Sequence, residues 1–193
     1  MRAVVFAIVL GLAAASPAMA QSPDLYARVN ARLAADPALA ARLGQPADEM
    51  RAVADMAGIW DVTAEVASSP DRGTSVITPL FGGLWLEIRD TYAAGTQDVT
   101  YLTYDPASAR WTSISIDSLA NANIGHAKAW MGDALVFDVD ATVLGLPAKL
   151  RQTMTRNGPN EYTIRNEEWL DGGWKLLDGY RYVRRAAPKP VAH

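Results

Sequence analysis

The chain contains no cysteine, and only two of its 193 residues are histidines. Without cysteine it has no disulfides, no thiolate metal ligands and no residue for lipid attachment. His193 is the last residue, so His126 is the only histidine within the expected folded region. One histidine without cysteine does not make a structural zinc site. We therefore expect no metal and no other cofactor.

Basic residues are also scarce, because 18 lysines and arginines stand against 21 acidic residues, for a net charge of −3. Mild acidity without basic clusters argues against nucleic acid or an anionic membrane as the main partner. The sequence also lacks a G-x-S-x-G motif, a phosphate-binding loop and a dinucleotide fingerprint. It therefore carries only a weak signal for catalysis.

Long apolar runs are absent except near the start, where residues 3–15 are almost purely apolar. Ala18-Met19-Ala20 then places small residues before Gln21, which is the layout of a cleavable secretory signal peptide. The apolar run is shorter than the roughly 20 residues that span a bilayer, although a retained anchor is the alternative. We predict a signal peptide over residues 1–20, no membrane span after its cleavage, and a periplasmic or secreted protein.

Residues 21–57 have the pattern of short helices. Ser22-Pro23-Asp24 combines an N-cap, a proline at the first helical position and an acidic first turn. Asp36-Pro37 begins a second helix that should end at Gly44, and Pro46 begins a third. We expect this helical segment to cap one end of the domain that follows.

From Gly58 onward the hydrophobic period changes from helical spacing to two, which is typical of half-buried strands. The first strand runs from Gly58 to Val66, and turn residues separate nine further candidates: 75–80, 83–92, 98–104, 109–118, 123–131, 134–142, 148–156, 161–170 and 173–184. The connections have no room for crossover helices, so the strands form an antiparallel meander. We predict that residues 58–185 form a closed up-and-down barrel of about ten strands, with a two-sheet sandwich as the alternative and a disordered tail over 186–193.

Several segments resemble a bacterial family of uncharacterised, exported lipocalin-like proteins of the calycin type. The matching segments are Met56-Ala57-Gly58-Ile59-Trp60, Phe81-Gly82-Gly83-Leu84-Trp85-Leu86-Glu87-Ile88-Arg89, Tyr104-Asp105-Pro106, Arg110-Trp111-Thr112-Ser113, Asp117-Ser118, Trp130 and Tyr180-Arg181-Tyr182. The resemblance covers roughly residues 45–185 and implies a ten-strand barrel with a helical cap, but no established activity. It also implies that Trp60 lies across one end of the barrel, with Arg181 of the last strand stacked on it.

More distantly, the chain is similar to the haem-binding barrels called nitrobindins. Those proteins coordinate iron through a histidine near the end of the chain. Here only His193 stands near the end, on the expected tail. This departure argues against haem binding.

Two strands have mixed sidedness, so the pattern alone does not orient them. In residues 83–92 one face carries Trp85, Glu87 and Arg89, and the other carries Leu84, Leu86 and Ile88. The resemblance favours the first face as the cavity lining, whereas local alternation favours the second as the core. In residues 109–118, Trp111, Ser113, Ser115 and Asp117 likewise alternate with Thr112, Ile114 and Ile116. Our candidate ligand-binding residues are Trp85, Glu87, Arg89, Trp111, Ser113 and Asp117.

Three functions are compatible with this sequence. The first is an exported barrel whose lumen binds a small hydrophobic or amphiphilic ligand, mostly apolar with a polar head group. The second is an enzyme in which Glu87 or Asp117 acts as acid or base beside Arg89. The third is a ligand-free structural or interaction domain. The pattern does not identify the ligand or the oligomeric state.

Overall fold

The computed structural model describes residues 23–66 and 71–186. The predicted signal peptide and residues 187–193 of the predicted tail lie outside the described residues. The chain divides into one unit that ends at Ala41 and another that begins at Arg42. No helix in the described part of the chain is both long and apolar enough to cross a membrane.

The first unit contains helix α1 (Pro23–Ala35) and most of α2 (Pro37–Arg42). Both helices begin at the prolines that the sequence indicates. Asp36 caps α2, because its Oδ1 accepts a hydrogen bond from the Leu39 N–H at 2.9 Å. The start of α2 therefore follows from local capping chemistry.

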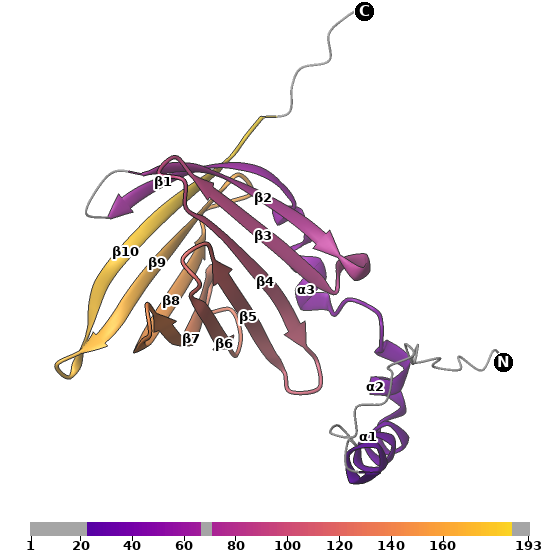
Figure 1. The fold of residues 1–193 in the computed structure, drawn as a ribbon. Coiled ribbons are helices and arrows are strands. Elements are labelled where there is room, and N and C mark those ends of the chain that lie inside the picture. Colours follow the sequence, from indigo (N-terminus) through magenta and orange to yellow (C-terminus); the bar gives the residue numbers. More distant parts are fainter. Residues whose placement is uncertain (1–22, 67–70, 187–193) are drawn as a thin grey trace, which may run out of the picture. The chain divides into compact units, whose positions relative to one another are not determined.

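The second unit is a closed barrel of ten antiparallel strands, as predicted, in which each strand pairs with its neighbours in sequence and β10 pairs with β1 (Figure 1). Closure excludes the two-sheet sandwich. The strands are β1 (Gly58–Val66), β2 (Arg72–Leu80), β3 (Trp85–Tyr92), β4 (Gln97–Asp105), β5 (Arg110–Asp117), β6 (Ala122–Ala127), β7 (Ala134–Val143), β8 (Leu146–Arg156), β9 (Glu161–Leu170) and β10 (Gly173–Arg184). A short 3₁₀ turn, η2 (Phe81–Gly83), precedes β3.

Side chains alternate along the strands between the lumen and the outside of the barrel. In β7, Leu135, Phe137 and Val139 are buried, whereas Asp138 and Asp140 between and beyond them are exposed. This alternation is the pleat that a period of two requires. It fills the inside of the barrel with a mostly apolar core.

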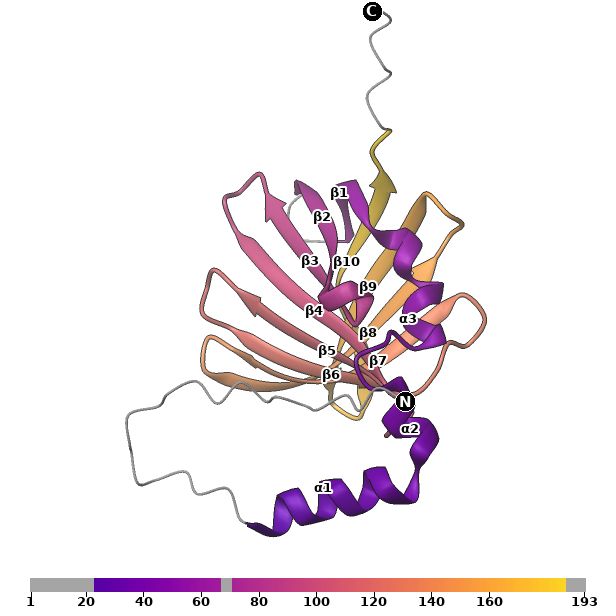
Figure 2. The same cartoon turned by 90° about the vertical axis from the view of Figure 1, so that its right-hand side faces the viewer.

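Helix α3 (Asp48–Ala52) and the 3₁₀ turn η1 (Ala54–Met56) lead directly into β1 and cover one end of the barrel (Figure 2). Met50, Val53 and Met56 are buried there with Trp60, each at most 2% exposed. Burial of these side chains removes a large apolar area from water. We call this the closed end, and the opposite end, where β3 turns into β4 and β5 into β6, the mouth.

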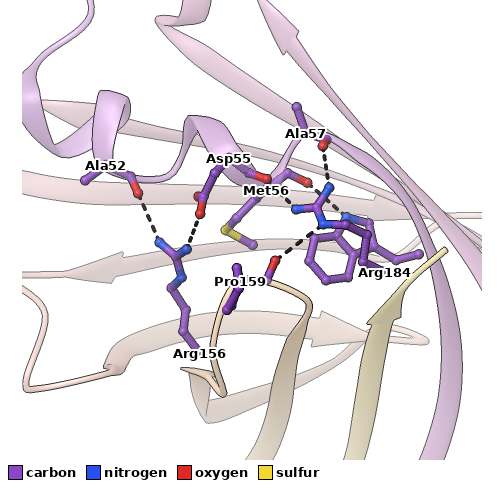
Figure 3. Close-up of polar contacts among 8 residues, drawn as sticks. Ala52, Asp55, Met56, Ala57, Arg156, Pro159 and Arg184 are labelled. Atoms are coloured by element: carbon purple, nitrogen blue, oxygen red, sulfur yellow. Dashed lines mark hydrogen bonds and ion pairs between the residues drawn. The ribbon is translucent and has the colours of Figure 1, made fainter. Parts of the chain in front are cut away.

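Arg184 holds the closed end together (Figure 3). Its guanidinium carbon lies 4.2 Å from the centroid of the Trp60 ring. Its Nη1 donates a hydrogen bond to the Ala57 carbonyl at 2.9 Å, and Nη2 donates to the Asp55 carbonyl. The Trp60 indole Nε1 donates to the Met56 carbonyl at 2.9 Å. One side chain thus joins the last strand to the segment that precedes the first.

The expectation that Arg181 stacks on Trp60 is wrong. Arg184 lies opposite Trp60 in the pairing of β1 with β10, whereas Arg181 lies opposite Thr63. Arg181 instead pairs with Glu161 of the neighbouring strand. The sequence does not distinguish Arg181 from Arg184, three residues further on, because the register between the first and last strands is not visible in it.

Gly58, two residues before Trp60, is explained by the same contact. Its φ angle is 137°, a backbone conformation that residues other than glycine rarely adopt. A Cβ at this position would also lie 2.8 Å from Arg184 Nη1. Glycine therefore leaves the space in which the guanidinium reaches the Ala57 carbonyl.

Candidate functional site

The lumen contains a cavity of about 330 Å³. Its apolar floor includes Leu102, Phe137 and Met154, and its lining reaches Thr96 and Ser118 at the mouth. A second space of about 250 Å³ adjoins it and shares a polar wall with it, formed by Ser113, Ser115, Asp117, Asn123, Gln152, Asn166 and Asp178. The barrel is therefore apolar and sealed at the closed end, and hollow and polar toward the mouth.

A row of three carboxylates crosses this polar region on neighbouring strands. Asp90 of β3 lies directly opposite Asp98 of β4, and Asp98 lies directly opposite Asp117 of β5. All of them line the larger cavity. Like charges placed directly opposite one another on a sheet repel and destabilise it. We call Asp90, Asp98 and Asp117 the acidic row.

The electrostatics of the row centre on Asp98. Burial, and then the neighbouring charges of Asp90 and Asp117, raise the pKa of Asp98 to about 7. Burial also raises the pKa of Asp90, against the opposing effect of the Ser75, Tyr182 and Tyr92 hydroxyls. Near neutral pH Asp98 is therefore close to the midpoint between its protonated and ionised forms.

Asp117 at the mouth behaves differently. Its partial burial raises the pKa, but hydrogen bonds from Asn121 and Leu119 outweigh this and hold the pKa below its ordinary value. Asp117 Oδ1 accepts from the Leu119 N–H at 2.8 Å and from the Asn121 N–H at 2.9 Å. Asp117 therefore stays ionised and also shapes the turn between β5 and β6.

A fourth carboxylate, Asp178 of β10, lines both cavities from the opposite wall. The pairing of β10 with β9 is irregular between Leu176 and Asp178, and such bulges commonly redirect side chains near functional sites. Burial raises the pKa of Asp178, and the Asn166 amide, which donates to its Oδ1 at 2.6 Å, opposes this effect.

Tyrosines form the wall beside Asp90. Tyr182 donates its hydroxyl to Asp90 Oδ2 at 2.8 Å. Its ring stacks on Tyr162 with centroids 4.3 Å apart, and Tyr92 lies against Tyr180 with centroids 5.7 Å apart. Four aromatic rings thus face the same lumen as the carboxylates.

Several buried polar atoms in this lining have no hydrogen-bond partner. They include Asp90 Oδ1, Tyr162 OH and Asn123 Oδ1. Asp90 and Tyr162 are only 4% and 3% exposed. Buried polar groups in folded proteins are nearly always paired, so unpaired atoms around a cavity indicate a place for a bound molecule or ordered water.

Positive charge is absent from the lining. Among the residues that the structure describes, no lysine, arginine or histidine lines either space. The same part of the chain has no group of three or more histidine, aspartate or glutamate side chains suited to a metal ion. His126 lies in the wall, its Nδ1 3.3 Å from Thr112 Oγ1. The lumen is thus acidic, without a basic partner of its own.

The structure places the two predicted site strands differently. On β5, Ser113 and Asp117 line the cavity, and Trp111 is fully buried on the same face, edge-on to Tyr104 at 5.4 Å. The polar face of β5, and not the face of Ile114, is therefore the inner one. The part of these residues in binding stays a prediction.

On β3 the expected inward orientation of Trp85, Glu87 and Arg89 is corrected. Leu86, Ile88 and Asp90 face inward instead, since Leu86 is only 1% exposed and the other two line the cavity. Glu87 and Arg89 pair with each other on the outer face at 3.0 Å. The physical reason is the cost of burying a charged pair when the opposite face offers apolar side chains.

Sequence reasoning missed Asp90, Asp98 and Asp178. A signal for Asp90 was present, because it continues the period of two from Leu86 and Ile88. Asp98 stands at the start of a strand and Asp178 at a bulge, where alternation does not fix the side. Their convergence depends on strand register, which the sequence does not show.

The chain shares its fold, but little of its sequence, with a solved structure. No protein-family model and no curated protein matches it. The crystal structure of Rv2717c from M. tuberculosis is similar with a TM-score of 0.54 and 13% identity, over 74% of this chain and 100% of that chain. A redesigned β-barrel, mFAP1, bound to DFHBI, has a TM-score of 0.33 and 17% identity, over 70% of this chain and 99% of that chain. The likeness to Rv2717c shows the barrel fold alone, so the lipocalin-like resemblance stays a prediction.

Proposed function

We propose that this protein binds a small ligand in the barrel lumen, with the apolar part toward the floor and a polar head group at the acidic row. The observation that carries the proposal is the cavity of about 330 Å³ lined by unpartnered buried polar atoms. Its volume lies within the range of small-molecule sites, which are typically mostly apolar with a few convergent polar groups. From the signal-peptide pattern, we propose that binding takes place after export.

Native mass spectrometry of protein purified without denaturation tests this proposal. We expect a bound small molecule on the wild type. Ser115→Trp should abolish it, because Ser115 lines both spaces and an indole there occupies the region that they share. The matched control is Ile124→Trp, which adds the same ring to a side chain that is 49% exposed on the outside.

Loss of the bound mass in Ser115→Trp with retention in Ile124→Trp supports lumenal binding. A bound mass that survives in Ser115→Trp contradicts it, as does a wild type without any bound mass. Circular dichroism on both variants checks that the strands are intact.

A second candidate function is acid or base catalysis in the same cavity. It is favoured by Asp98, whose pKa burial and neighbouring charges raise to about 7, the value suited to proton transfer near neutral pH. Glu87, on the outer face, does not reach the cavity. Incubation of the molecule found by mass spectrometry with fresh protein distinguishes the two: an enzyme yields a product that Asp98→Asn does not, whereas a binding protein returns the molecule unchanged.

A further inference from the structure

We infer that the head group bound in this lumen is an organic cation, an ammonium or guanidinium group, held by the carboxylates of Asp90 and Asp98. This inference rests on the proposed lumenal binding. It goes further by naming the charge and chemistry of the ligand.

The first support is the unbalanced charge of the cavity. Four carboxylates line it, and no basic side chain among the described residues does. A carboxylate held away from water needs a partner charge or several hydrogen bonds. A cation that enters from the mouth supplies the missing partner, whereas an anion adds to the repulsion.

The second support is independent of charge. Asp90 is 4% exposed and lines the cavity, and its Oδ1 accepts no hydrogen bond, although the buried Ser75 hydroxyl, which also makes none, lies close enough to oppose the effect of burial on the Asp90 pKa. Tyr182 and Tyr92 are both near the other oxygen, Oδ2, at 2.8 and 3.5 Å. An N–H donor on the ligand satisfies Oδ1, and ammonium and guanidinium groups carry several such donors.

The geometry favours an organic cation over a metal ion. Among the residues that the structure describes, no group of three or more histidine, aspartate or glutamate side chains is placed to hold a metal ion, and hard cations usually take six or more oxygen ligands. The rings of Tyr92, Tyr162 and Tyr180 line the same space. Aromatic faces attract organic cations and also pack against an apolar ligand body.

Without a bound cation, Asp98 holds a proton that offsets part of the negative charge of the row. The groups that face Asp98 are Asp90 and Tyr92 from β3, Asp117 from β5, Tyr162 from β9 and Tyr180 from β10. None of these groups is positively charged at neutral pH. Entry of a cation therefore displaces the proton held by Asp98, so binding strengthens as pH rises and releases a proton below neutral pH.

Isothermal titration calorimetry with three probes of one body tests the inference. The probes are 1-naphthylmethylamine, 1-naphthalenemethanol and 1-naphthoate, which carry an ammonium, a hydroxyl and a carboxylate on the same rings. At pH 8 we expect the ammonium to bind at least about tenfold more tightly than the alcohol, and the carboxylate more weakly than both. At pH 5.5 the advantage of the ammonium should shrink, although the amine itself stays protonated.

Two isosteric variants locate the effect. Asp98→Asn should bind the alcohol as the wild type does but lose most of the preference for the ammonium. Asp140→Asn is the matched control, because Asp140 is exposed on the outside of β7, and it should keep the preference. At pH 6, titrations in buffers of different ionisation enthalpy should show release of up to about one proton per bound amine in the wild type and none in Asp98→Asn.

The outcomes separate this inference from the proposed function. Binding of the alcohol with no preference for the ammonium at pH 8 overturns the cation inference and leaves lumenal binding intact. Binding of none of the three probes overturns both. The head-group and pH comparisons use the wild type alone, so they remain decisive if Asp98→Asn does not fold.

Discussion

The raised pKa of Asp98 makes the stability of the folded protein depend on pH. Its carboxyl group is flanked by two others, and its pKa is raised to about 7, first by burial and then by those charges. In the unfolded chain an aspartate has a pKa of about 3.9. Between these values the folded protein keeps a proton that the unfolded chain releases, so this residue lowers the unfolding free energy as pH rises from about 4 to 7.

Asp98→Asn should remove this pH dependence, because an amide does not ionise. We expect the variant to be more stable than the wild type at pH 8, by on the order of 2–4 kcal/mol, and about equally stable at pH 4. Urea denaturation of both proteins from pH 4 to 8 measures the difference. Stability curves of wild type and variant that run parallel across this range would falsify the assignment, and Asp140→Asn serves as the control that should run parallel.

At the closed end, Arg184 is the single residue whose contacts we expect to contribute most to stability. Arg184→Lys keeps the charge but loses the planar fork that stacks on Trp60 while donating to the Ala57 and Asp55 carbonyls. We expect a loss of about 2–3 kcal/mol in unfolding free energy, from the cation–π contact and the lost hydrogen bonds. Urea denaturation at pH 7 measures it, with Arg181→Lys as the control that should leave the midpoint unchanged. Equal losses in the two variants would contradict the role given to Arg184.

For strand β3, the sequence predicts the strand itself but not which of its faces points into the barrel. The period of two predicts the strand itself, but both of its faces carry large apolar side chains, Trp85 on one and Leu86 on the other. The side that faces inward is decided by the partners of Glu87 and Arg89, which pair with each other outside. The row of Asp90, Asp98 and Asp117 then follows from hairpin register, which becomes visible only once the strands are paired.

The orientation of β3 is testable because the chain has no native cysteine. Arg89→Cys should react rapidly with a large maleimide reagent, since the Arg89 side chain is 49% exposed. Leu86→Cys should react much more slowly in the folded protein, since Leu86 is 1% exposed. Mass spectrometry over time measures both rates, with denatured protein as the reference for full reactivity. Rapid modification of Leu86→Cys with protection of Arg89→Cys would reverse the assigned faces.

At the scale of the whole molecule, the barrel has one closed and one hollow end. Regular strands and short turns predict ten strands and closure, since closure leaves no exposed edge. The Gly58-Ile59-Trp60 segment indicates which end is sealed. The cavity is not predictable in this way, because its volume depends on how far the core side chains of all strands fill the interior.

Removal of the Trp60 ring should weaken the whole barrel. Trp60 is 2% exposed and lies edge-on to Tyr162 at 5.0 Å, so Trp60→Ala leaves a large void at the closed end. We expect a loss of about 3–5 kcal/mol, seen as a lower midpoint in a thermal melt. A melt that matches the wild type would show that the seal does not contribute to stability.

The most direct measurement of the central claim, an enclosed acidic lumen suited to a cation, is the pH titration of the Asp98 carboxyl carbon by NMR. We expect a midpoint near 7 in the folded protein. Saturation with 1-naphthylmethylamine should shift that midpoint to lower pH, because the bound ammonium favours the ionised carboxylate. A midpoint near 4 without ligand, as in an exposed aspartate, would show that Asp98 does not lie in an enclosed acidic lumen.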